Sequence, residues 1–315
     1  MNIDEIINSI DSNNLDIAFG RVVNISAVTL SAVGLDVAVG DIVRIESAQK
    51  LYTVLGMVTV LKDGLFVIVP FSFIDGFKIN DKVFLQRDGL TVKCGNGLLG
   101  RVVNALGDPI DDLGKIRDLD TNAPINKESM SPLDRGIIDK KFATGVKAID
   151  SMLTCGKGQK VGIFAGSGVG KSTLMGMIVQ GCEATIKVIA LVGERGREIP
   201  EFIHYNLNNN LENTVIVTAT SDESPLMRKY AAFTAMTIAE YFRDKGYDVL
   251  LMMDSVTRFA MAQREIGLST GEPPVSRGYP PSVFALLPQL MERAGNSKKG
   301  SITAFFTVLV DGDDL

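Results

Sequence analysis

The segment 165–173 has the residue types of a phosphate-binding loop, with glycines followed by lysine and serine, although Ala165 stands where the stricter pattern has glycine. Glycines let successive backbone N–H groups curl around an anion, and a helix after them directs its amino-terminal dipole at the same place. The ammonium group of Lys171 would then reach the β- and γ-phosphates, and the Ser172 hydroxyl would ligate Mg²⁺. We therefore predict a nucleotide site formed by Gly166, Ser167, Gly168, Val169, Gly170, Lys171, Ser172 and Thr173.

Two carboxylates further along the chain stand where a hydrolytic nucleotide site needs them. Asp254 follows the apolar run 249–253, so it ends a predicted buried strand and can hold Mg²⁺ through its water shell. Glu194 is the first acid after the predicted strand 188–192, at the edge where open α/β sheets bind ligands. We predict that Glu194 orients or deprotonates water and that Arg195 neutralises γ-phosphate charge. The alternatives are a strand-end cap at Asp254 and a solvated charge cluster around Glu194.

The elements that must position these residues alternate between strands and helices from about residue 141 onwards. The predicted strands are apolar on both faces, which is typical of a parallel sheet covered by helices on either side. Ser224 followed by Pro225 is typical of a helix start, and we expect this helix to end near Arg243. The other predicted elements are strands at 160–164, 187–192, 215–218, 248–253 and 301–309, and a helix at 172–179.

The first part of the chain has a different residue pattern, typical of β-strands, and no residues that suggest catalysis. Residues 16–90 contain short runs of Val, Ile, Leu, Phe and Thr between glycine-containing turns, which predicts a small β-barrel. Residues 91–140 hold many turn dipeptides and are interpreted as a connector to the α/β domain, 141–315. In residues 1–15, isoleucines three and four positions apart predict an amphipathic helix that docks a partner or packs on the core.

Composition argues against several classes of protein. Of the 315 residues, 46% are apolar and 22% charged, which is typical of a folded globular protein. No uncharged apolar run is long enough to span a bilayer, and the acidic start lacks the basic residues of a signal peptide. A net charge of −5 argues against a protein that grips nucleic acid. Three cysteines without a close pair and a single histidine, His204, support neither disulfides nor a zinc site, so we expect a cytosolic protein.

Four blocks of the sequence resemble the export ATPases of bacterial type III secretion, most of all the flagellum-specific ones. These are relatives of the catalytic β subunit of rotary ATPases, in the RecA-like class. The resemblance implies an N-terminal small β-barrel followed by a RecA-like P-loop domain with a mainly parallel sheet. It runs from about residue 18 to the end of the chain, and the four blocks are 144–173, 192–202, 254–295 and 300–315.

The resemblance also implies an activity and the residues that perform it. The chain would be a Mg²⁺-dependent ATPase that energises flagellar protein export, transferring the γ-phosphoryl group of ATP to water at a subunit interface. ATP and Mg²⁺ are therefore the implied cofactors. The resemblance places phosphate binding on Lys171, metal binding on Ser172 and Asp254, catalysis on Glu194, and γ-phosphate sensing on Arg195 and Arg293.

Partners and location follow from the same resemblance. It implies a homo-hexamer in which the proline-rich loop 271–282 faces the central pore and engages a central stalk protein or substrate. Further implied partners are a stator or regulatory protein at the N-terminal helix, export substrates with their chaperones, and the cytoplasmic face of the export gate. The implied location is the cytoplasm, peripheral to the inner face of the cytoplasmic membrane, and no nucleic-acid partner is expected.

The sequence departs from this family at its end. The family continues past the equivalent of 312–315 with another strand, a helical C-terminal domain and an arginine finger, so we expect the helical domain to be absent here. Because finger arginines supply about 10³–10⁵-fold in rate, a non-hydrolysing nucleotide-binding fragment or subunit is one alternative function. A virulence-type secretion ATPase is another, and a Rho-like nucleic-acid motor ranks below both.

Overall fold

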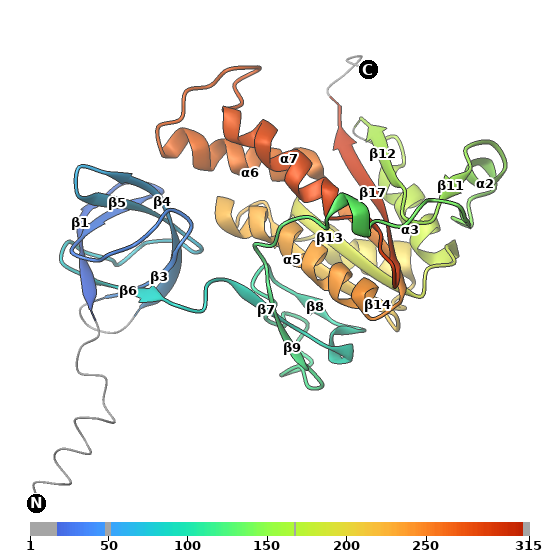
Figure 1. Ribbon diagram of the computed structural model, residues 1–315, viewed down its shortest axis with the longest axis horizontal. Helices are drawn as coiled ribbons and strands as arrows, with labels where there is room; N and C mark the ends of the chain where they lie inside the picture. The colour runs from blue at the N-terminus through green and yellow to red at the C-terminus, as the bar shows by residue number, and fades with distance from the viewer. Residues whose placement is uncertain (1–17, 48–51, 167, 311–315) are drawn as a thin grey trace, which may run out of the picture. The chain divides into compact units, whose positions relative to one another are not determined.

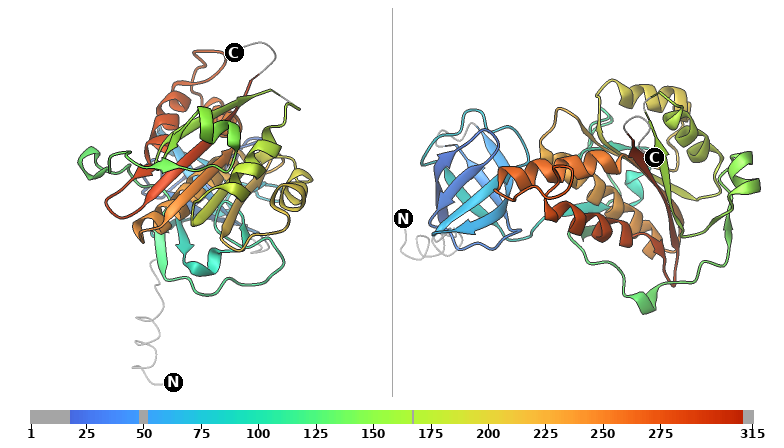
Figure 2. Two further views of the ribbon diagram at one scale, coloured as in Figure 1. Left: turned by 90° about the vertical axis from the view of Figure 1, so that its right-hand side faces the viewer. Right: turned by 90° about the horizontal axis from the view of Figure 1, so that it is seen from above.

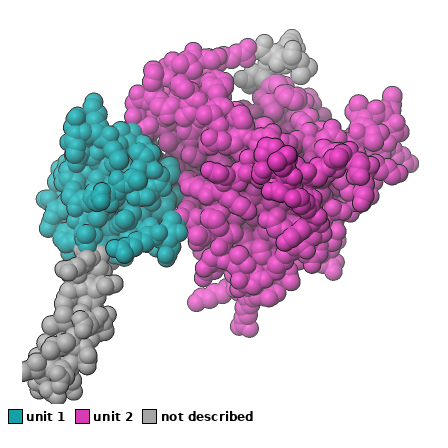
Figure 3. Space-filling view, viewed as in Figure 1, with its two compact units in different colours: residues 1–89 teal, residues 90–315 magenta. Residues whose placement is uncertain are grey.

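The chain divides into two compact units, residues 1–89 and 90–315, which Figure 3 distinguishes by colour. The computed structural model describes residues 18–47, 52–166 and 168–310. The helix predicted within residues 1–15 lies outside the described residues. Among the helices that the structure describes, none has the length and apolar character needed to cross a lipid bilayer.

The first unit is a closed barrel of antiparallel strands in the order β1-β2-β5-β4-β3-β6, seen in blue in Figure 1. Successive side chains of a strand point to opposite faces, and the inward ones, such as Val22, Val43 and Val83, are fully buried. The predicted small β-barrel is confirmed. Its strands are β1 (Phe19–Ile25), β2 (Leu30–Val33), β3 (Ile42–Glu46), β4 (Thr53–Lys62), β5 (Leu65–Pro70) and β6 (Lys82–Gln86).

The second unit is built on a seven-stranded sheet. Its strands run parallel in the order β12-β17-β15-β13-β14-β8, and the short β16 pairs antiparallel with β17. The predicted α/β domain with a mainly parallel sheet is confirmed. The strands are β8 (Val102–Val103), β12 (Lys160–Ala165), β13 (Ile186–Glu194), β14 (Thr214–Thr220), β15 (Asp248–Asp254), β16 (Gly295–Asn296) and β17 (Ser301–Leu309).

Helices cover both faces of this sheet (Figures 1 and 2). On one face, α3 (Lys171–Gly181) packs its buried Met175 and Ile178 into a core that includes Ile189 of β13. On the other face, α5 (Pro225–Asp244) and α6 (Val256–Ser269) pack against β13 and β17, and α7 (Pro281–Glu292) packs against α6. The predicted start of α5 is confirmed, because the Ser224 hydroxyl accepts a hydrogen bond from the Met227 N–H at 3.2 Å.

Residues 91–140, expected as a connector, contribute strands to the second unit. β7 (Thr91–Cys94) pairs with β9 (Thr121–Pro124), and β8 extends the main sheet beside β14. These strands are too short to stand out from the turns around them. The remaining short elements are η1 (Asn96–Leu98), η2 (Pro132–Asp134), β10 (Lys141–Phe142), α2 (Lys147–Met152), β11 (Cys155–Gly156), α4 (Glu198–Glu201) and the π-helical turn η3 (Phe202–Asn206).

Candidate functional site

The carboxyl ends of four parallel strands meet at one edge of the main sheet, next to a cleft of about 600 Å³. β12 leads into the glycine loop, β13 ends at Glu194, β15 ends at Asp254 and β17 ends at Leu309. Parallel strands end on the same side of a sheet, so residues far apart in the sequence come together here. The cleft is lined by Gly166, Gly168, Gly170, Lys171, Ser172, Thr173, Glu194, Arg195, Glu198, Arg258, Leu309 and Val310.

The glycine loop joins β12 to α3 and has the backbone of an anion-binding loop. Gly168 and Gly170 have φ angles of 78° and 94°, in the left-handed region that residues with a Cβ rarely adopt. Of the predicted loop residues within the described part of the chain, only Val169 does not line the cleft. Ser167, also predicted here, lies outside the described residues. Because α3 begins at Lys171, its positive end faces the cleft, which favours a bound phosphate.

Lys171 lies between the two predicted carboxylates. Its Nζ is 2.5 Å from Asp254 Oδ1 and 3.9 Å from Glu194 Oε1. The Thr307 hydroxyl of the neighbouring strand β17 donates to the same Asp254 oxygen at 2.7 Å. The side chains of Lys171, Glu194 and Asp254 are only 12%, 16% and 7% exposed. The structure therefore brings together a cation and two carboxylates from three different elements, in a place largely shielded from water.

Glu194 lies in surroundings that disfavour its ionised form. Its Oε1 atom is buried and makes no hydrogen bond within the described part of the chain. Burial, the negative charge of Asp254 and a hydrogen bond with Glu198 raise the pKa of the Glu194 carboxyl from 4.5 to about 7, although Lys171 opposes the change. A carboxyl group with a pKa near 7 accepts a proton from water at neutral pH more readily than an ordinary glutamate. This is the chemistry that the sequence analysis assigned to Glu194.

Among the described residues, two arginines line the cleft, and the sequence pointed to one of them. The side chain of Arg195 is 68% exposed and lies 3.9 Å from Glu198, at the rim. Arg258, which the sequence analysis did not single out, lines the cleft from the first turn of α6. Its Nε is buried and has no hydrogen-bond partner among the residues that the structure describes, so the guanidinium can take up the charge of a bound anion. The sequence signal for Arg258 is its position, one helical turn after the strand-end residue Asp254.

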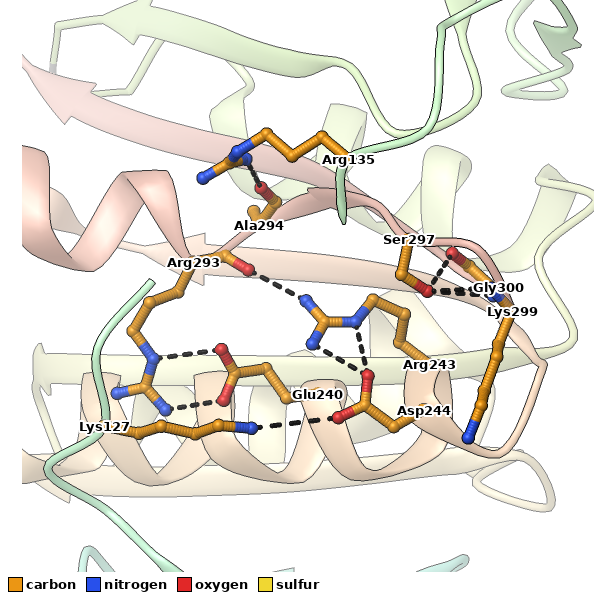
Figure 4. Close-up of polar contacts among 10 residues, drawn as sticks. All are labelled: Lys127, Arg135, Glu240, Arg243, Asp244, Arg293, Ala294, Ser297, Lys299 and Gly300. Atoms are coloured by element: carbon orange, nitrogen blue, oxygen red, sulfur yellow. Dashed lines mark hydrogen bonds and ion pairs between the residues drawn. The ribbon is translucent and has the colours of Figure 1, made fainter. Parts of the chain in front are cut away.

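Arg293 does not belong to this site. It lies between α7 and β16, and β16 pairs with the start of β17, whereas the cleft lies at the end of that strand. Figure 4 shows its guanidinium paired with Glu240 of α5, at 2.8 and 3.1 Å. It also donates to the Thr237 hydroxyl and to the Ile125 carbonyl. The prediction that Arg293 senses the γ-phosphate is therefore wrong, because the guanidinium is buried and held by hydrogen bonds at the opposite edge of the sheet.

The oxygen donors at the site suit Mg²⁺. Ser172 and Asp254, the two predicted ligands, line a small cavity of about 120 Å³ together with Glu194. In nucleotide sites Mg²⁺ takes a few protein oxygens and completes its shell with waters and phosphates. The Ser172 hydroxyl, the Asp254 carboxylate and the buried Oε1 of Glu194 fit a hydrated Mg²⁺–nucleotide complex.

Residues 145–315 match the family model described as the ATP synthase alpha/beta family, nucleotide-binding domain. The chain belongs to this family. Within it, the chain is 60% identical to a flagellum-specific ATP synthase of Helicobacter pylori (strain J99) over 298 residues, which is 94% of this chain and 68% of that protein. The expected resemblance to flagellar and type III secretion ATPases is thereby confirmed.

Solved structures of this family confirm the fold. The assembled ATPase EscN of the enteropathogenic E. coli type III secretion system superposes with a TM-score of 0.87 at 45% identity, covering 94% of this chain and 71% of that chain. EscN in complex with its central stalk EscO gives a TM-score of 0.86 at the same 45% identity, covering 92% of this chain and 71% of that chain. Both structures therefore resemble nearly the whole of this chain, barrel and α/β unit included.

Proposed function

We propose that this chain is a Mg²⁺-dependent ATPase that energises protein export by the bacterial flagellar type III secretion apparatus. The observation that carries the proposal is the meeting of Lys171, Asp254 and Glu194 beside a glycine loop, at one end of a parallel sheet. A protein that only binds nucleotide needs the loop and the lysine. It does not need a buried carboxyl group with a pKa near 7 next to them.

Each side chain has a role that its position allows. Lys171 contacts the β- and γ-phosphates, and Glu194 accepts the proton of the attacking water. Arg258, from within the cleft, stabilises negative charge that develops on the γ-phosphate, and Arg195 does so from the rim. Mg²⁺, held by Ser172 and Asp254, would neutralise part of the phosphate charge.

The flagellar branch is proposed over the virulence branch on similarity. The chain is 60% identical to the flagellum-specific relative and 45% identical to the type III secretion ATPase EscN. The names of these relatives describe those proteins, and a shared ATPase core serves both branches. Export by the flagellar apparatus is therefore our proposal for this chain, and a virulence-type ATPase is the alternative.

The proposed working form is a homo-hexamer around a central stalk, with ATP hydrolysed between subunits. EscN has been solved as an assembly and with the stalk EscO, which supports this arrangement for a chain of the same fold. We further propose that the protein acts at the inner face of the cytoplasmic membrane, next to the export gate. A stator or regulatory protein at residues 1–15, and export substrates with their chaperones, remain predictions.

The test is the rate of Mg-ATP hydrolysis by the purified chain at increasing protein concentration. We expect the rate per molecule to rise with concentration, because subunits must associate to complete a shared site. Glu194→Gln should bind Mg-ATP like the parent and show no turnover, and Glu212→Gln, which alters an exposed carboxylate before β14, should keep the parental rate. ATP binding without turnover in the parent would instead favour a non-hydrolysing nucleotide-binding subunit.

A further inference from the structure

One face of α3 lies against the π-helical turn η3. Ser172, Gly176 and Gln180 are spaced four residues apart along α3, so they form a row on one side of the helix. All three contact Asn206, the last residue of the turn. Ser172, at the N-terminal end of this row, is the predicted ligand of Mg²⁺.

The three contacts fix the position of Asn206 closely. The Asn206 side-chain amide donates to the backbone carbonyl of Ser172 at 3.1 Å, and the Gln180 amide donates to the Asn206 carbonyl. Between them, a Cβ added at Gly176 would lie 2.7 Å from Asn206 Cβ and 2.9 Å from its carbonyl oxygen. Glycine in a helix interior costs about 0.5–1 kcal/mol relative to alanine, so this close approach explains a residue that α3 alone would not favour.

Asn206 ends the segment that begins at Glu194. From the end of β13 the chain runs through α4, which carries Glu198 near its start, and then through η3. Ser172, Glu194 and Asn206 all line the same cavity of about 120 Å³. π-Helical turns are rare and frequently occur at functional sites. The hydrogen bond from Asn206 to Ser172 therefore joins the segment of the proposed base to the helix of the proposed metal ligand.

The structure assigns Asn206 as a positioning residue that sets the separation between Ser172 and Glu194. By holding the first turn of α3 against η3, it fixes where a metal bound to Ser172 lies relative to water activated by Glu194. This inference rests on the proposed function. Gly176 and Gln180 act with Asn206, since one permits the close approach and the other holds the Asn206 carbonyl.

The test compares Asn206→Leu, which removes the amide but keeps similar bulk, with Gly176→Ala, which forces the turn away from α3. The measurement is ATP affinity, by equilibrium binding, in Mg²⁺ and in EDTA, alongside kcat and KM. In both variants we expect the gain in ATP affinity caused by Mg²⁺ to be about tenfold smaller than in the parent, and kcat to be about tenfold lower. A tenfold loss is the lower end of the effect of mutating residues that orient metal ligands. ATP affinity in EDTA should stay within about twofold of the parent, because the backbone of the glycine loop is untouched.

Matched controls act on the same two elements without touching this contact. Tyr205→Ala removes a side chain that is 73% exposed on η3, and Met177→Ala removes one that is 50% exposed on α3, and both should behave like the parent. Parental Mg²⁺ dependence and kcat in Asn206→Leu and Gly176→Ala, with circular dichroism showing folded protein, would overturn the positioning role. A parent chain whose ATP affinity does not respond to Mg²⁺ would overturn the proposed function, and the inference with it.

Discussion

The charge state of Glu194 makes the stability of the nucleotide-free protein depend on pH in a predictable way. Its carboxyl pKa is raised in the folded chain, from 4.5 to about 7, mainly by burial. Below pH 4.5 the group is neutral in both the folded and the unfolded chain. As the pH rises towards 7, the unfolded chain ionises first, so the folded state progressively loses stability, and the loss is complete above pH 7. Replacing Glu194 with glutamine removes this dependence, because glutamine does not ionise.

The size of the effect follows from the two pKa values. At 1.36 kcal/mol for each pKa unit, the full cost of ionising Glu194 in the folded chain is about 3 kcal/mol. Part of this cost is already present at pH 5.5. We therefore expect the free energy of unfolding of Glu194→Gln, relative to the parent, to rise by about 2 kcal/mol between pH 5.5 and pH 8. The direction is unusual, since the substitution of a proposed catalytic residue is expected to stabilise the protein.

Urea unfolding followed by far-ultraviolet circular dichroism measures this difference. The chain has two compact units, so the relevant transition is the one that Mg-ADP shifts to higher urea. Glu212→Gln, at an exposed position, should give a constant difference from the parent across the same pH range. Equal pH profiles for the parent and Glu194→Gln would refute the reasoning, because they would show that Glu194 ionises as easily in the fold as in the unfolded chain.

Three further predictions concern two residues of the cleft, Glu194 and Arg258, and the buried Arg293 at the opposite edge of the sheet. The kcat/KM for Mg-ATP should fall about tenfold for each pH unit below about 7, as Glu194 becomes protonated; a flat profile from pH 5.5 to 7 would contradict its role as base. Arg258→Ala should lower kcat by about 10²-fold and leave ADP affinity nearly unchanged, as measured by steady-state kinetics and ADP titration. Equal losses in kcat and in ADP affinity would indicate a binding role instead. Arg293→Met should lower the free energy of unfolding by about 3–5 kcal/mol, because it leaves Glu240 buried and unpaired. ATP affinity of the folded variant should stay unchanged. A selective loss of ATP affinity would instead indicate that Arg293 contacts the γ-phosphate.

The sequence predicts the main sheet well because its signals are local. The stretch 301–309 is rich in apolar residues, and its predicted bounds agree with β17. The start of α5 follows from Ser224 and Pro225, whose capping geometry depends on neighbouring residues alone. The glycine loop and the strand-end acids are also local patterns, so a sheet with parallel strands is enough to bring Lys171, Glu194 and Asp254 to one edge.

Contacts that form only when the barrel closes, or when residues meet at one edge of the main sheet, are not visible in the sequence. The first unit shows no aromatic run, yet closing the barrel brings Phe19 of β1 and Phe84 of β6 to a centroid distance of 5.9 Å. Lys82 lies over the Phe19 ring at 4.7 Å, and Arg44 lies over the Phe84 ring at 5.0 Å. Such cation–π contacts join three strands that are far apart in the chain. The resemblance that implies a γ-phosphate role for Arg293 does not reveal at which edge of the sheet this residue lies, where it pairs with Glu240.

The pairing of Lys171 with Asp254 links phosphate binding to metal binding. Asp254 is 7% exposed, and its ion pair with Lys171 compensates its charge in the nucleotide-free chain. A phosphate that attracts Lys171 competes for this cation and leaves the buried carboxylate with the hydrogen bond from Thr307 but without its ion pair. Leaving a buried charge uncompensated costs several kcal/mol, so ATP alone should bind weakly, whereas a divalent cation near Asp254 restores the compensation. ATP and Mg²⁺ should therefore strengthen each other's binding by the same factor, as linkage requires.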